Sequence, residues 1–328
     1  MSKTGANPPI ALVCGISGQD GAYLSKLLLG KGYRVIGTSR DAFTNSFRNL
    51  RKLGIHERVE CISLAPNDFR SVLQVVSSVC PDEIYYLAGQ SSVGMSFDQP
   101  IETMQSIAEG VMNLLEVMRF LKSSARLFHS ASSEAYGDTV EPADENTPFR
   151  PRSPYGIAKA TSFWLVSSYR EAYRLNASNG ILFNHESPFR PDRFVTMKIV
   201  ASAARIAAGS DEKLRLGNLD IERDWGWAPD YVDGMWRALQ QDIPGDFVFA
   251  TGVSHKLEDF VGRAFELAGL DWRDHVVIDA SLFRPYDIGV SRANPAKAAA
   301  VLGWTAGVTF EQMVKNLFDS TLGVEATE

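Results

Sequence analysis

Two side chains suited to acid–base chemistry stand four residues apart, at Tyr155 and Lys159. On a helix, this spacing places the phenol and the ammonium one turn apart on the same face. A free phenol has a pKa near ~10, too high for a base at neutral pH, and a nearby cation favours the phenolate. The pair therefore indicates a tyrosine that accepts the proton of an alcohol. A packed surface helix is the alternative interpretation, because Tyr-x-x-x-Lys alone is common.

A serine and a carboxylate, Ser132 and Glu134, follow a short strand predicted at Arg126–His129. Ligands of a doubly wound sheet bind outside the carboxyl ends of its strands, so Ser132 could hydrogen-bond a reacting hydroxyl there. Simple alcohol oxidation needs no carboxylate. Removing a carbon-bound proton beside a ketone and expelling a hydroxyl does use one. The alternative is that Glu134 caps a turn.

A glycine-rich loop, Cys14–Gly21, follows the first predicted strand and opens a helix. Its glycines permit a tight turn and a close backbone approach to a phosphate, which the helix N-terminus would bind. No Gly-Lys-Ser/Thr follows, which argues against a P-loop. We therefore expect dinucleotide binding rather than a merely structural turn. Asp20 is expected mainly to cap the helix. The predicted cofactor contacts of the loop are Gly15, Ser17, Gly18, Gln19, Asp20 and Gly21.

The tip of the second predicted strand bears on the choice of dinucleotide. An acidic residue there would hold the ribose 2′-hydroxyl of NAD, whereas a neutral residue followed by arginine suits the 2′-phosphate of NADP. Ser39 and Arg40 favour NADP, while Asp41 argues for NAD. The alternative is that Arg40 and Asp41 are only solvated.

Strand-like and helix-like segments alternate through the first half, which predicts an α/β fold with a Rossmann-type, doubly wound parallel sheet. The second half is less regular, so we expect an NAD(P)-binding domain over residues 8–185. A smaller, interleaved C-terminal substrate lobe would cover residues 186–328, with some segments returning to the sheet. The predicted strands are Ile10–Cys14, Tyr33–Thr38, Val59–Leu64, Glu83–Ala88, Arg126–His129 and Gly180–Phe183. The predicted helices are Asp20–Leu29, Phe69–Val79, Ile101–Leu121 and Thr161–Tyr173, the last in a helix started by Ser153-Pro154.

Composition excludes several classes of protein. The 328 residues are 45% hydrophobic and 22% charged, the balance of an ordinary globular chain. A net charge of −6 argues against a nucleic-acid partner. No apolar run of 18 residues and no apolar leader over Met1–Pro9 occur, so we expect neither membrane association nor export, and a cytoplasmic location. Cys14, Cys61 and Cys80 lack metal-site spacing and are expected to be buried.

Taken together, these residues resemble an extended short-chain dehydrogenase/reductase of the NAD-dependent epimerase/dehydratase superfamily, and within it the GDP-mannose 4,6-dehydratases. The likeness covers about residues 10–320. The segments that are specific to this branch are Phe183–Pro188 and Arg223–Gly226. The other segments that carry it are Gly15–Gly21, Leu87–Ser91, Ser132–Glu134, Pro151–Tyr155 with Lys159, Phe194–Thr196, Gly217–Asp220, Ala250–Gly252, Arg284-Pro285 and Leu302–Trp304.

The resemblance implies a hydro-lyase that converts GDP-mannose to GDP-4-keto-6-deoxymannose with NADP, or alternatively NAD. Tyr155 would deprotonate the sugar 4-hydroxyl while hydride leaves C4. Glu134 would remove the C5 proton and assist loss of the C6 hydroxyl as water, and hydride would return to C6. Lys159 would lower the pKa of Tyr155 and bind the nicotinamide ribose. Ser132 would supply the hydroxyl that the family's threonine usually provides.

The same resemblance implies further ligands and no metal site. A cluster of Lys198, Arg223 and Arg284 would face the diphosphate inside an acidic chain, since cations and forked arginine donors suit that group. His185 would support the cofactor, or alternatively be a satisfied core histidine. The implied cofactor contacts beyond the glycine loop are Arg40, Leu87, Ala88, Gln90, Tyr155, Lys159 and His185. The implied substrate contacts are Ser91, Asn184, Lys198, Arg223, Arg284 and Asp287.

The chain departs from the usual family pattern at several positions, which leaves the base and the sugar open. These positions are Arg40-Asp41 and Phe189-Arg190 in place of paired arginines, Ser63 in place of aspartate, Trp227 in place of histidine, and a short Leu270–Phe283 segment.

Two other functions remain as alternatives. The first is a nucleotide-sugar reductase or epimerase of the same fold, for which epimerisation would need no carboxylate at Glu134. The second is a non-catalytic, nucleotide-sensing Rossmann protein. We also expect a homodimer or homotetramer that associates through Ile101–Leu121 and Thr161–Tyr173.

Overall fold

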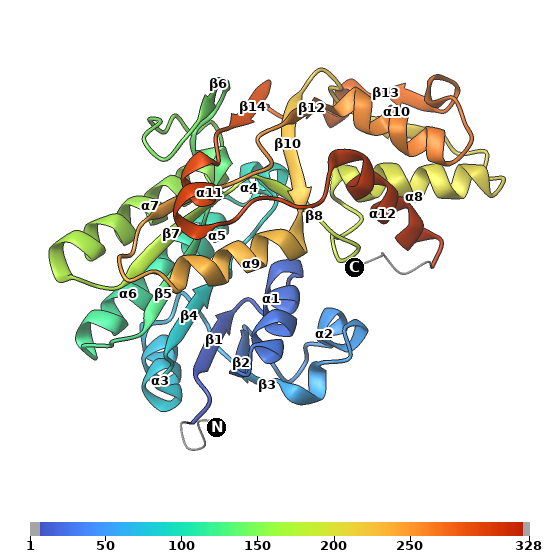
Figure 1. Ribbon diagram of the computed structural model, residues 1–328. Helices are drawn as coiled ribbons and strands as arrows, with labels where there is room; N and C mark the ends of the chain where they lie inside the picture. Colours follow the sequence, from blue (N-terminus) through green and yellow to red (C-terminus); the bar gives the residue numbers. More distant parts are fainter. Residues whose placement is uncertain (1–6, 324–328) are drawn as a thin grey trace.

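A parallel sheet of seven strands forms the centre of the molecule (Figure 1). The computed structural model describes residues 7–323. The expectation that Met1–Pro9 contains no apolar leader therefore concerns residues that lie mostly outside the described part. The strand order is β11-β7-β5-β4-β1-β2-β3, and each neighbouring pair is parallel. The order reverses between β1 and β4, which creates the crevice where doubly wound sheets bind ligands. The predicted Rossmann-type α/β fold is confirmed.

Most elements of this sheet match the sequence-based expectation within a few residues. The strands are β1 (Ile10–Cys14), β2 (Arg34–Ser39), β3 (Glu60–Ser63), β4 (Glu83–Tyr86), β5 (Arg126–Ser132), β7 (Ala177–Leu182) and β11 (Asp246–Phe249). The helices are α1 (Gln19–Gly30), α2 (Arg48–Lys52), α3 (Phe69–Val79), α4 (Val93–Asp98), α5 (Pro100–Met104), α6 (Gly110–Phe120), α7 (Pro154–Tyr173), α9 (Ala228–Leu239) and α11 (Ala296–Leu302). The single-turn elements are η1 (His56–Arg58), the π-helical η2 (Gln105–Glu109) and η3 (Ser133–Ala135).

The expected helix Ile101–Leu121 is formed by α5, η2 and α6 in direct succession, but its middle turn, η2, is π-helical rather than α-helical. Periodicity of apolar residues cannot reveal one inserted residue of this kind, since the spacing on either side stays helical. The carbonyl of Ser106 in this turn accepts a hydrogen bond from the Tyr86 hydroxyl at the end of β4 (3.4 Å). The irregular turn therefore lies against a strand end that borders the ligand crevice.

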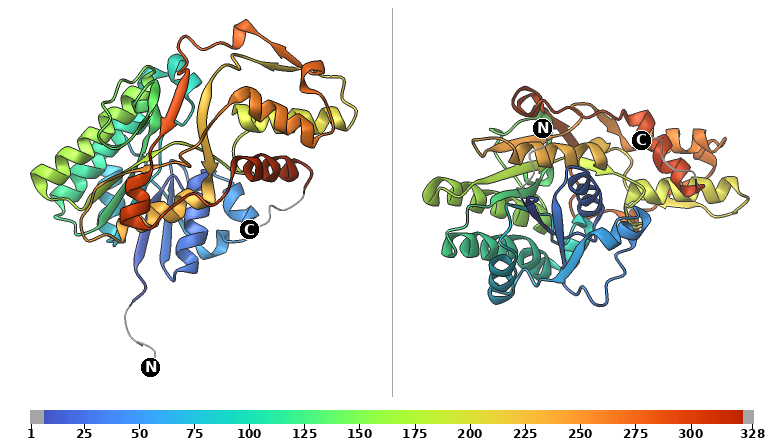
Figure 2. Two further views of the ribbon diagram at one scale, coloured as in Figure 1. Left: turned by 45° about the horizontal axis from the view of Figure 1, so that its top comes forward. Right: turned by 60° about the horizontal axis from the view of Figure 1, so that its bottom comes forward.

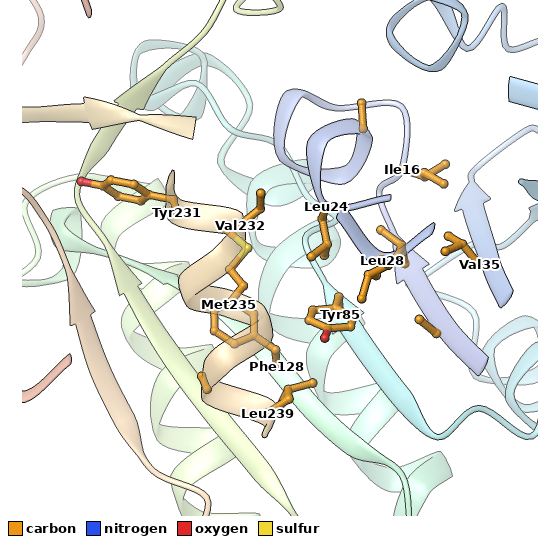
Figure 3. Close-up of a cluster of buried hydrophobic side chains, with 14 of the residues drawn as sticks. Ile16, Leu24, Leu28, Val35, Tyr85, Phe128, Tyr231, Val232, Met235 and Leu239 are labelled. Atoms are coloured by element: carbon orange, nitrogen blue, oxygen red, sulfur yellow. The ribbon is translucent and has the colours of Figure 1, made fainter. Parts of the chain in front are cut away.

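Helices cover both faces of the sheet with apolar side chains. On one face, α1 and α9 pack together over β1, β4 and β5, with Leu24, Leu28 and Met235 at the centre (Figure 3). On the other face, Val72 of α3, Leu114 of α6 and Val166 of α7 belong to a second cluster. A sheet buried on both faces explains why its strands read as continuous apolar runs in the sequence.

A smaller lobe lies beyond the carboxyl ends of the central strands (Figure 2). Its own apolar core includes Trp225 and Trp227, both buried, as expected of packing residues. Its strands are β6 (Thr139–Ala143), β8 (Asn184–Glu186), β9 (Leu214–Leu216), β10 (Glu222–Trp227), β12 (Ser254–Lys256), β13 (Val276–Ile278) and β14 (Val290–Ala293). Its helices are α8 (Val195–Ala207), α10 (Leu257–Leu267), α12 (Phe310–Thr321) and the short η4 (Trp272–Asp274) and η5 (Ala280–Leu282).

The chain passes between the two parts more than once. β6 lies early in the sequence but pairs with β14 of the lobe, while β11 comes late and pairs with β7 of the central sheet. Residues from both halves of the sequence therefore meet at the crevice.

The cysteines differ from expectation. Cys14 is buried in β1, but Cys61 is only partly buried and Cys80 is exposed, and all three are free. Cys80 is the C-cap of α3 and has a left-handed backbone conformation with a φ of 47°, so the helix ends there. Within residues 7–323, no helix is long and apolar enough to cross a membrane. The same residues contain no group of three or more His, Cys, Asp or Glu side chains that could hold a metal ion.

The packing of β5, β7 and β11 predicts that Gly180→Ala destabilises the fold. A Cβ at Gly180 would lie 2.3 Å from the ring of Phe128 and 3.1 Å from that of Phe249, and both rings are fully buried. We expect a loss of about 1–3 kcal/mol in the free energy of unfolding, measured with urea. Gly30→Ala, at an open position with no atom within 4 Å, is the control and should be neutral or slightly stabilising. Equal stability of both variants would contradict this packing.

Candidate active site

Two adjoining cavities open at the crevice between β1 and β4. The glycine-loop cavity, of about 810 Å³, is lined by the Gly15–Gly21 turn, the tip of β2 and the segment after β4. The Tyr155 cavity, of about 480 Å³, is lined by the end of β5, the start of α7, and the lobe. The two cavities share Asp20, Leu87, Ala88, Gly89, Gln90, Ser91, Arg190 and Arg193. A long ligand could therefore extend from one cavity into the other.

The glycine loop has the close packing that a pyrophosphate-binding turn requires. Gly15 has a φ of +89°, and a Cβ there would lie 2.9 Å from the backbone nitrogen of Ala88. A Cβ at Gly21 would lie 2.5 Å from the carbonyl oxygen of Gly15, so α1 can start directly against the loop. Gly18 precedes α1, and the first N–H groups of that helix face the cavity end of the turn. The residues present fit a bound dinucleotide.

Asp20 does not cap α1, contrary to expectation. Gly18 is the N-cap and makes no side-chain hydrogen bond. The Asp20 carboxylate instead contacts Nε2 of His185 at 3.0 Å. Although burial opposes its ionisation, His185 and Arg190 hold the pKa of Asp20 at about 2. The positive charge of Arg190 therefore lies near this carboxylate and reduces the repulsion that it would exert on a pyrophosphate.

His185 lies at the junction of β8 with the glycine loop. Its Nδ1 contacts the carbonyl oxygen of Phe183 at 2.7 Å, and its ring stacks on Tyr231 with centroids 4.5 Å apart. The Gln19 side chain donates to the backbone carbonyl of His185 and accepts from the Ser187 hydroxyl. His185 thus combines both interpretations, because it is a satisfied buried histidine that also lines the Tyr155 cavity.

At the tip of β2, Arg40 lines the glycine-loop cavity but is mostly exposed and pairs with Glu102 at 2.9 Å. Asp41 makes contacts of a different kind, within its own turn. Its carboxylate accepts hydrogen bonds from the backbone N–H groups of Phe43 and Thr44, and these contacts, with the Thr44 side chain, lower its pKa. Asp41 therefore organises the loop, while Arg40 keeps an exposed guanidinium beside the cavity.

The start of α7 places Tyr155 against the turn that carries Ser132 and Glu134. Ser153 caps the helix by accepting from the N–H of Gly156 at 3.0 Å. A Cβ at Gly156 would lie 2.6 Å from the carbonyl oxygen of Glu134, so only glycine allows this approach. Ser132 ends β5 and caps η3 through the N–H of Glu134. Capping and close contact thereby bring three predicted catalytic residues into one cavity.

Lys159 is buried beneath this cavity, and its Nζ donates to the carbonyl oxygen of Ser130 at 2.6 Å. Burial lowers the pKa of Lys159 to about 8. The expectation that Lys159 lowers the pKa of Tyr155 is not met by the protein groups alone. Burial raises the pKa of Tyr155 to about 12, opposed by a hydrogen bond with Ser132. The phenol is thus a proton donor in the protein itself, and a phenolate requires further positive charge nearby.

Glu134 is a partly buried carboxyl with an altered acidity. Burial raises its pKa, while the positive charges of Arg223 and Arg284 oppose this rise. A carboxyl whose pKa is raised towards neutrality exchanges protons more readily than an ordinary glutamate, which suits a group that both takes and returns a proton.

The predicted basic cluster is only partly formed. Arg223 is buried and pairs with Asp287 at 3.1 Å, and Arg284 pairs with the same carboxylate oxygen at 3.3 Å. Lys198 lines the same cavity, but its ammonium donates to the carbonyl oxygen of Arg215 at 2.6 Å. Arg223, Asp287 and Arg284 therefore form one unit, and Lys198 stands apart from it.

All residues predicted for the site line one of the two cavities. Those in the Tyr155 cavity alone are Ser132, Glu134, Tyr155, Lys159, Asn184, His185, Lys198, Arg223, Arg284 and Asp287. Those in the glycine-loop cavity alone are Gly15, Ser17, Gly18, Gln19, Gly21 and Arg40, and those shared are Asp20, Leu87, Ala88, Gln90 and Ser91.

Two arginines to which the sequence assigned no ligand role, Arg190 and Arg193, also line both cavities. Arg190 pairs with Glu186 at 2.9 Å and donates to the backbone carbonyl of His185. Arg193 gave no sequence signal beyond its place in a loop after β8, where a charge is usually solvated. Arg190 was noted only as part of Phe189-Arg190, which stands in place of paired arginines.

Comparison with known proteins agrees with this geometry. The sequence model of the family described as GDP-mannose 4,6 dehydratase matches residues 12–317. GDP-mannose 4,6 dehydratase 2 of Arabidopsis thaliana is 42% identical, covering 97% of this chain and 88% of its own length. GDP-mannose 4,6-dehydratase of Sinorhizobium fredii is 42% identical, with 90% and 91% coverage. The UDP-glucose 4-epimerase of Thermus thermophilus, solved with NAD, superposes with a TM-score of 0.84 at 25% identity, covering 96% and 99%. A nicotinamide dinucleotide cofactor is therefore supported.

The buried ammonium of Lys159 predicts a pH dependence of cofactor binding. With a pKa of about 8, Lys159 is charged below that pH and loses its proton as the pH rises through it. We expect the Kd for NADP, measured by titration between pH 6.5 and 9.5, to rise above about pH 8. Lys159→Met should bind more weakly throughout and lack this pH dependence. Lys315→Met, on the exposed face of α12, is the control and should behave as the wild type. An unchanged pH profile in Lys159→Met would contradict the assignment.

Proposed function

The chain belongs to the GDP-mannose 4,6-dehydratase family, and from that premise we propose how its residues carry out the reaction. The enzyme is a hydro-lyase that converts GDP-mannose to GDP-4-keto-6-deoxymannose. The overall change is the loss of one water molecule, with oxidation at C4 balanced by reduction at C6. The bound dinucleotide supplies a reversible hydride acceptor, so it is regenerated in each cycle.

Tyr155 is the group that exchanges a proton with the sugar 4-hydroxyl. It stands beside Ser132, whose hydroxyl forms a hydrogen bond with the phenol and can also orient the sugar oxygen. The ammonium of Lys159 donates a hydrogen bond to the Ser130 carbonyl, which fixes it near Tyr155 and Ser132. At this place it can also bind the nicotinamide ribose. The protein thus fixes the reacting oxygen between a proton acceptor and a hydroxyl.

Glu134 performs the elimination. A ketone at C4 acidifies the C5 proton, which Glu134 accepts as a carboxylate. The same carboxyl then gives its proton to the departing C6 hydroxyl, which leaves as water. A solvent-derived proton restores C5 when C6 is reduced. The observation that carries this role is the place of Glu134, which lines the cavity of Tyr155 within the electrostatic influence of Arg223 and Arg284.

The substrate diphosphate is assigned to Arg223 and Arg284, whose paired guanidinium groups offer several donors on one side of the cavity. Ser91, Asn184 and Lys198 line the remaining wall. Asp287 would accept from substrate hydroxyls once the diphosphate draws the arginines towards itself. The guanine base would then lie in the lobe.

We further propose NADP as the cofactor. Support comes from the exposed Arg40 guanidinium at the tip of β2, where a 2′-phosphate would lie, and from the engagement of Asp41 in its own turn. Arg190, Arg193 and His185 add positive or hydrogen-bonding groups along the shared wall.

The assembly and organisation follow as proposals from the same structure. Met112 and Phe120 on α6, and Ile157 and Trp164 on α7, recur at helical spacing and are exposed, which supports a homodimer or homotetramer formed through this face. We propose a division into domains at residues 8–185 and 186–328. β6 from the first range pairs within the lobe, and β11 from the second range pairs within the central sheet. A cytoplasmic location is proposed from the cofactor and substrate pools.

The dehydratase function predicts a specific change of mass. Purified protein with GDP-mannose and a catalytic amount of NADP should release a product lighter by one water, as measured by mass spectrometry. UDP-glucose and dTDP-glucose should serve as negative controls for the base. A product of unchanged mass would indicate an epimerase, and stoichiometric consumption of NADPH would indicate a reductase, so either result would contradict the proposal.

The role of Glu134 predicts that Glu134→Gln stops elimination. We expect kcat to fall by at least about 100-fold, because the amide cannot carry the proton from C5 to the leaving hydroxyl. GDP binding, measured by calorimetry, should stay within about threefold of wild type, since the amide keeps the shape of the side chain. The exposed Glu57→Gln, outside both cavities, is the control. Wild-type turnover in Glu134→Gln would remove the assigned role.

A further inference from the structure

The segment that presents Arg284 and Asp287 to the substrate has little packing of its own. Residues 281–286 are exposed, including Phe283 and Tyr286, and burial resumes only at Ile288. Both ligands nevertheless line the Tyr155 cavity. Polar contacts must therefore hold this segment in position beside the cavity.

Besides the ion pair between Asp287 and Arg223, one carboxylate, that of Asp138, supplies several of these contacts. Its Oδ2 accepts a hydrogen bond from the Tyr286 hydroxyl at 2.7 Å. Its Oδ1 accepts from the backbone N–H groups of Gly289 and Val290, at 2.7 and 3.3 Å. The two oxygens thus fix the chain on either side of Asp287. On the same tyrosine, the guanidinium of Arg152 lies 5.5 Å from the ring centre.

Asp138 comes from the turn that carries the elimination carboxyl. It follows Glu134 by four residues, and the chain bends between them at Gly137, whose φ is +74°. A Cβ at Gly137 would lie 2.4 Å from the carbonyl oxygen of Arg150, so this bend is fixed by the backbone that leads into α7. Directly after Asp138, β6 begins and pairs with β14. The catalytic turn and the ligand segment are therefore anchored at one residue.

We propose that Asp138 and Tyr286 form a latch that positions Arg284 for the substrate diphosphate and Asp287 for substrate hydroxyls, relative to Glu134. Both are positioning residues, since neither lines the cavity. The inference rests on the proposed roles of Arg284 and Asp287 in that reaction. The latch acts on a part of the substrate remote from the reacting carbons, so its contribution is the same in the ground state and the transition state.

The test uses Tyr286→Phe, Asp138→Asn and the double variant in the full-length enzyme. Tyr286→Phe removes only the hydroxyl, and an amide at Asp138 offers one acceptor oxygen where the carboxylate offers two. We expect each variant to raise KM for GDP-mannose about three- to tenfold, as for loss of one hydrogen bond of ordinary net strength, with kcat within about twofold. The double variant should raise KM no more than Asp138→Asn alone, because both changes break the same hydrogen bond.

Binding of GDP, measured by calorimetry, gives a readout that does not need turnover, and its Kd should rise by the same factor as KM. Asp271→Asn is the matched control, since this exposed lobe carboxylate also accepts from a backbone N–H, that of Arg273 at 3.0 Å. It should leave KM and Kd unchanged.

Unchanged Kd and KM in Tyr286→Phe, or a fall in kcat alone, would overturn the latch. If wild type bound GDP but dehydrated no GDP-mannose, the proposed function would fail, whereas weaker GDP binding in Tyr286→Phe would still support the latch.

Discussion

The approach of the first turn of α7 to the carbonyl of Glu134 is the contact on which the site depends. A Cβ at Gly156 would stand 2.6 Å from that oxygen, so the helix and the turn after β5 can meet only through a glycine. This contact places Tyr155 beside Ser132 and Glu134, although 20 residues or more separate them in sequence. Oxidation at C4 and elimination across C5 and C6 need their proton carriers within one sugar ring of each other, and this packing supplies that arrangement.

Charge is organised locally rather than over the whole chain. The protein carries a net charge of −6, yet Arg223 and Arg284 line the same Tyr155 cavity as the partly buried Glu134. Burial raises the pKa of Glu134 and these arginines oppose the rise, so the acidity of the elimination group and the binding of the diphosphate are coupled. Asp20 and His185 form a comparable pair at the boundary with the glycine loop. In both places a partly buried carboxylate has a cationic or hydrogen-bonding group from another element nearby, which offsets the cost of removing its charge from water.

The sequence was sufficient to predict six of the seven strands of the central sheet, the glycine loop and the Tyr155–Lys159 pair, because apolar runs, glycine spacing and helical spacing have direct steric causes. It did not predict β11, and it assigned no ligand role to Arg190 and Arg193, which line both cavities. It could not show contacts made across long sequence separations. Asp20 reads as a helix cap, yet it pairs with His185, 165 residues away. Asp138 carries no signal in a sequence, because its partners at 286–290 lie in a different element. The sequence indicates that Lys159 lowers the pKa of Tyr155. In the structure, burial is the largest influence on the pKa of both side chains, and burial is a property of the folded chain.

The central claim is that one cavity carries oxidation, elimination and reduction on the same sugar, with Tyr155 and Glu134 as the proton carriers. The most direct measurement uses GDP-mannose deuterated at C4, with a catalytic amount of NADP, and follows the label by NMR. The account predicts that deuterium appears at C6 of GDP-4-keto-6-deoxymannose, and that C5 takes its hydrogen from solvent. Deuterium that remains at C4, or that is absent from C6, would contradict it.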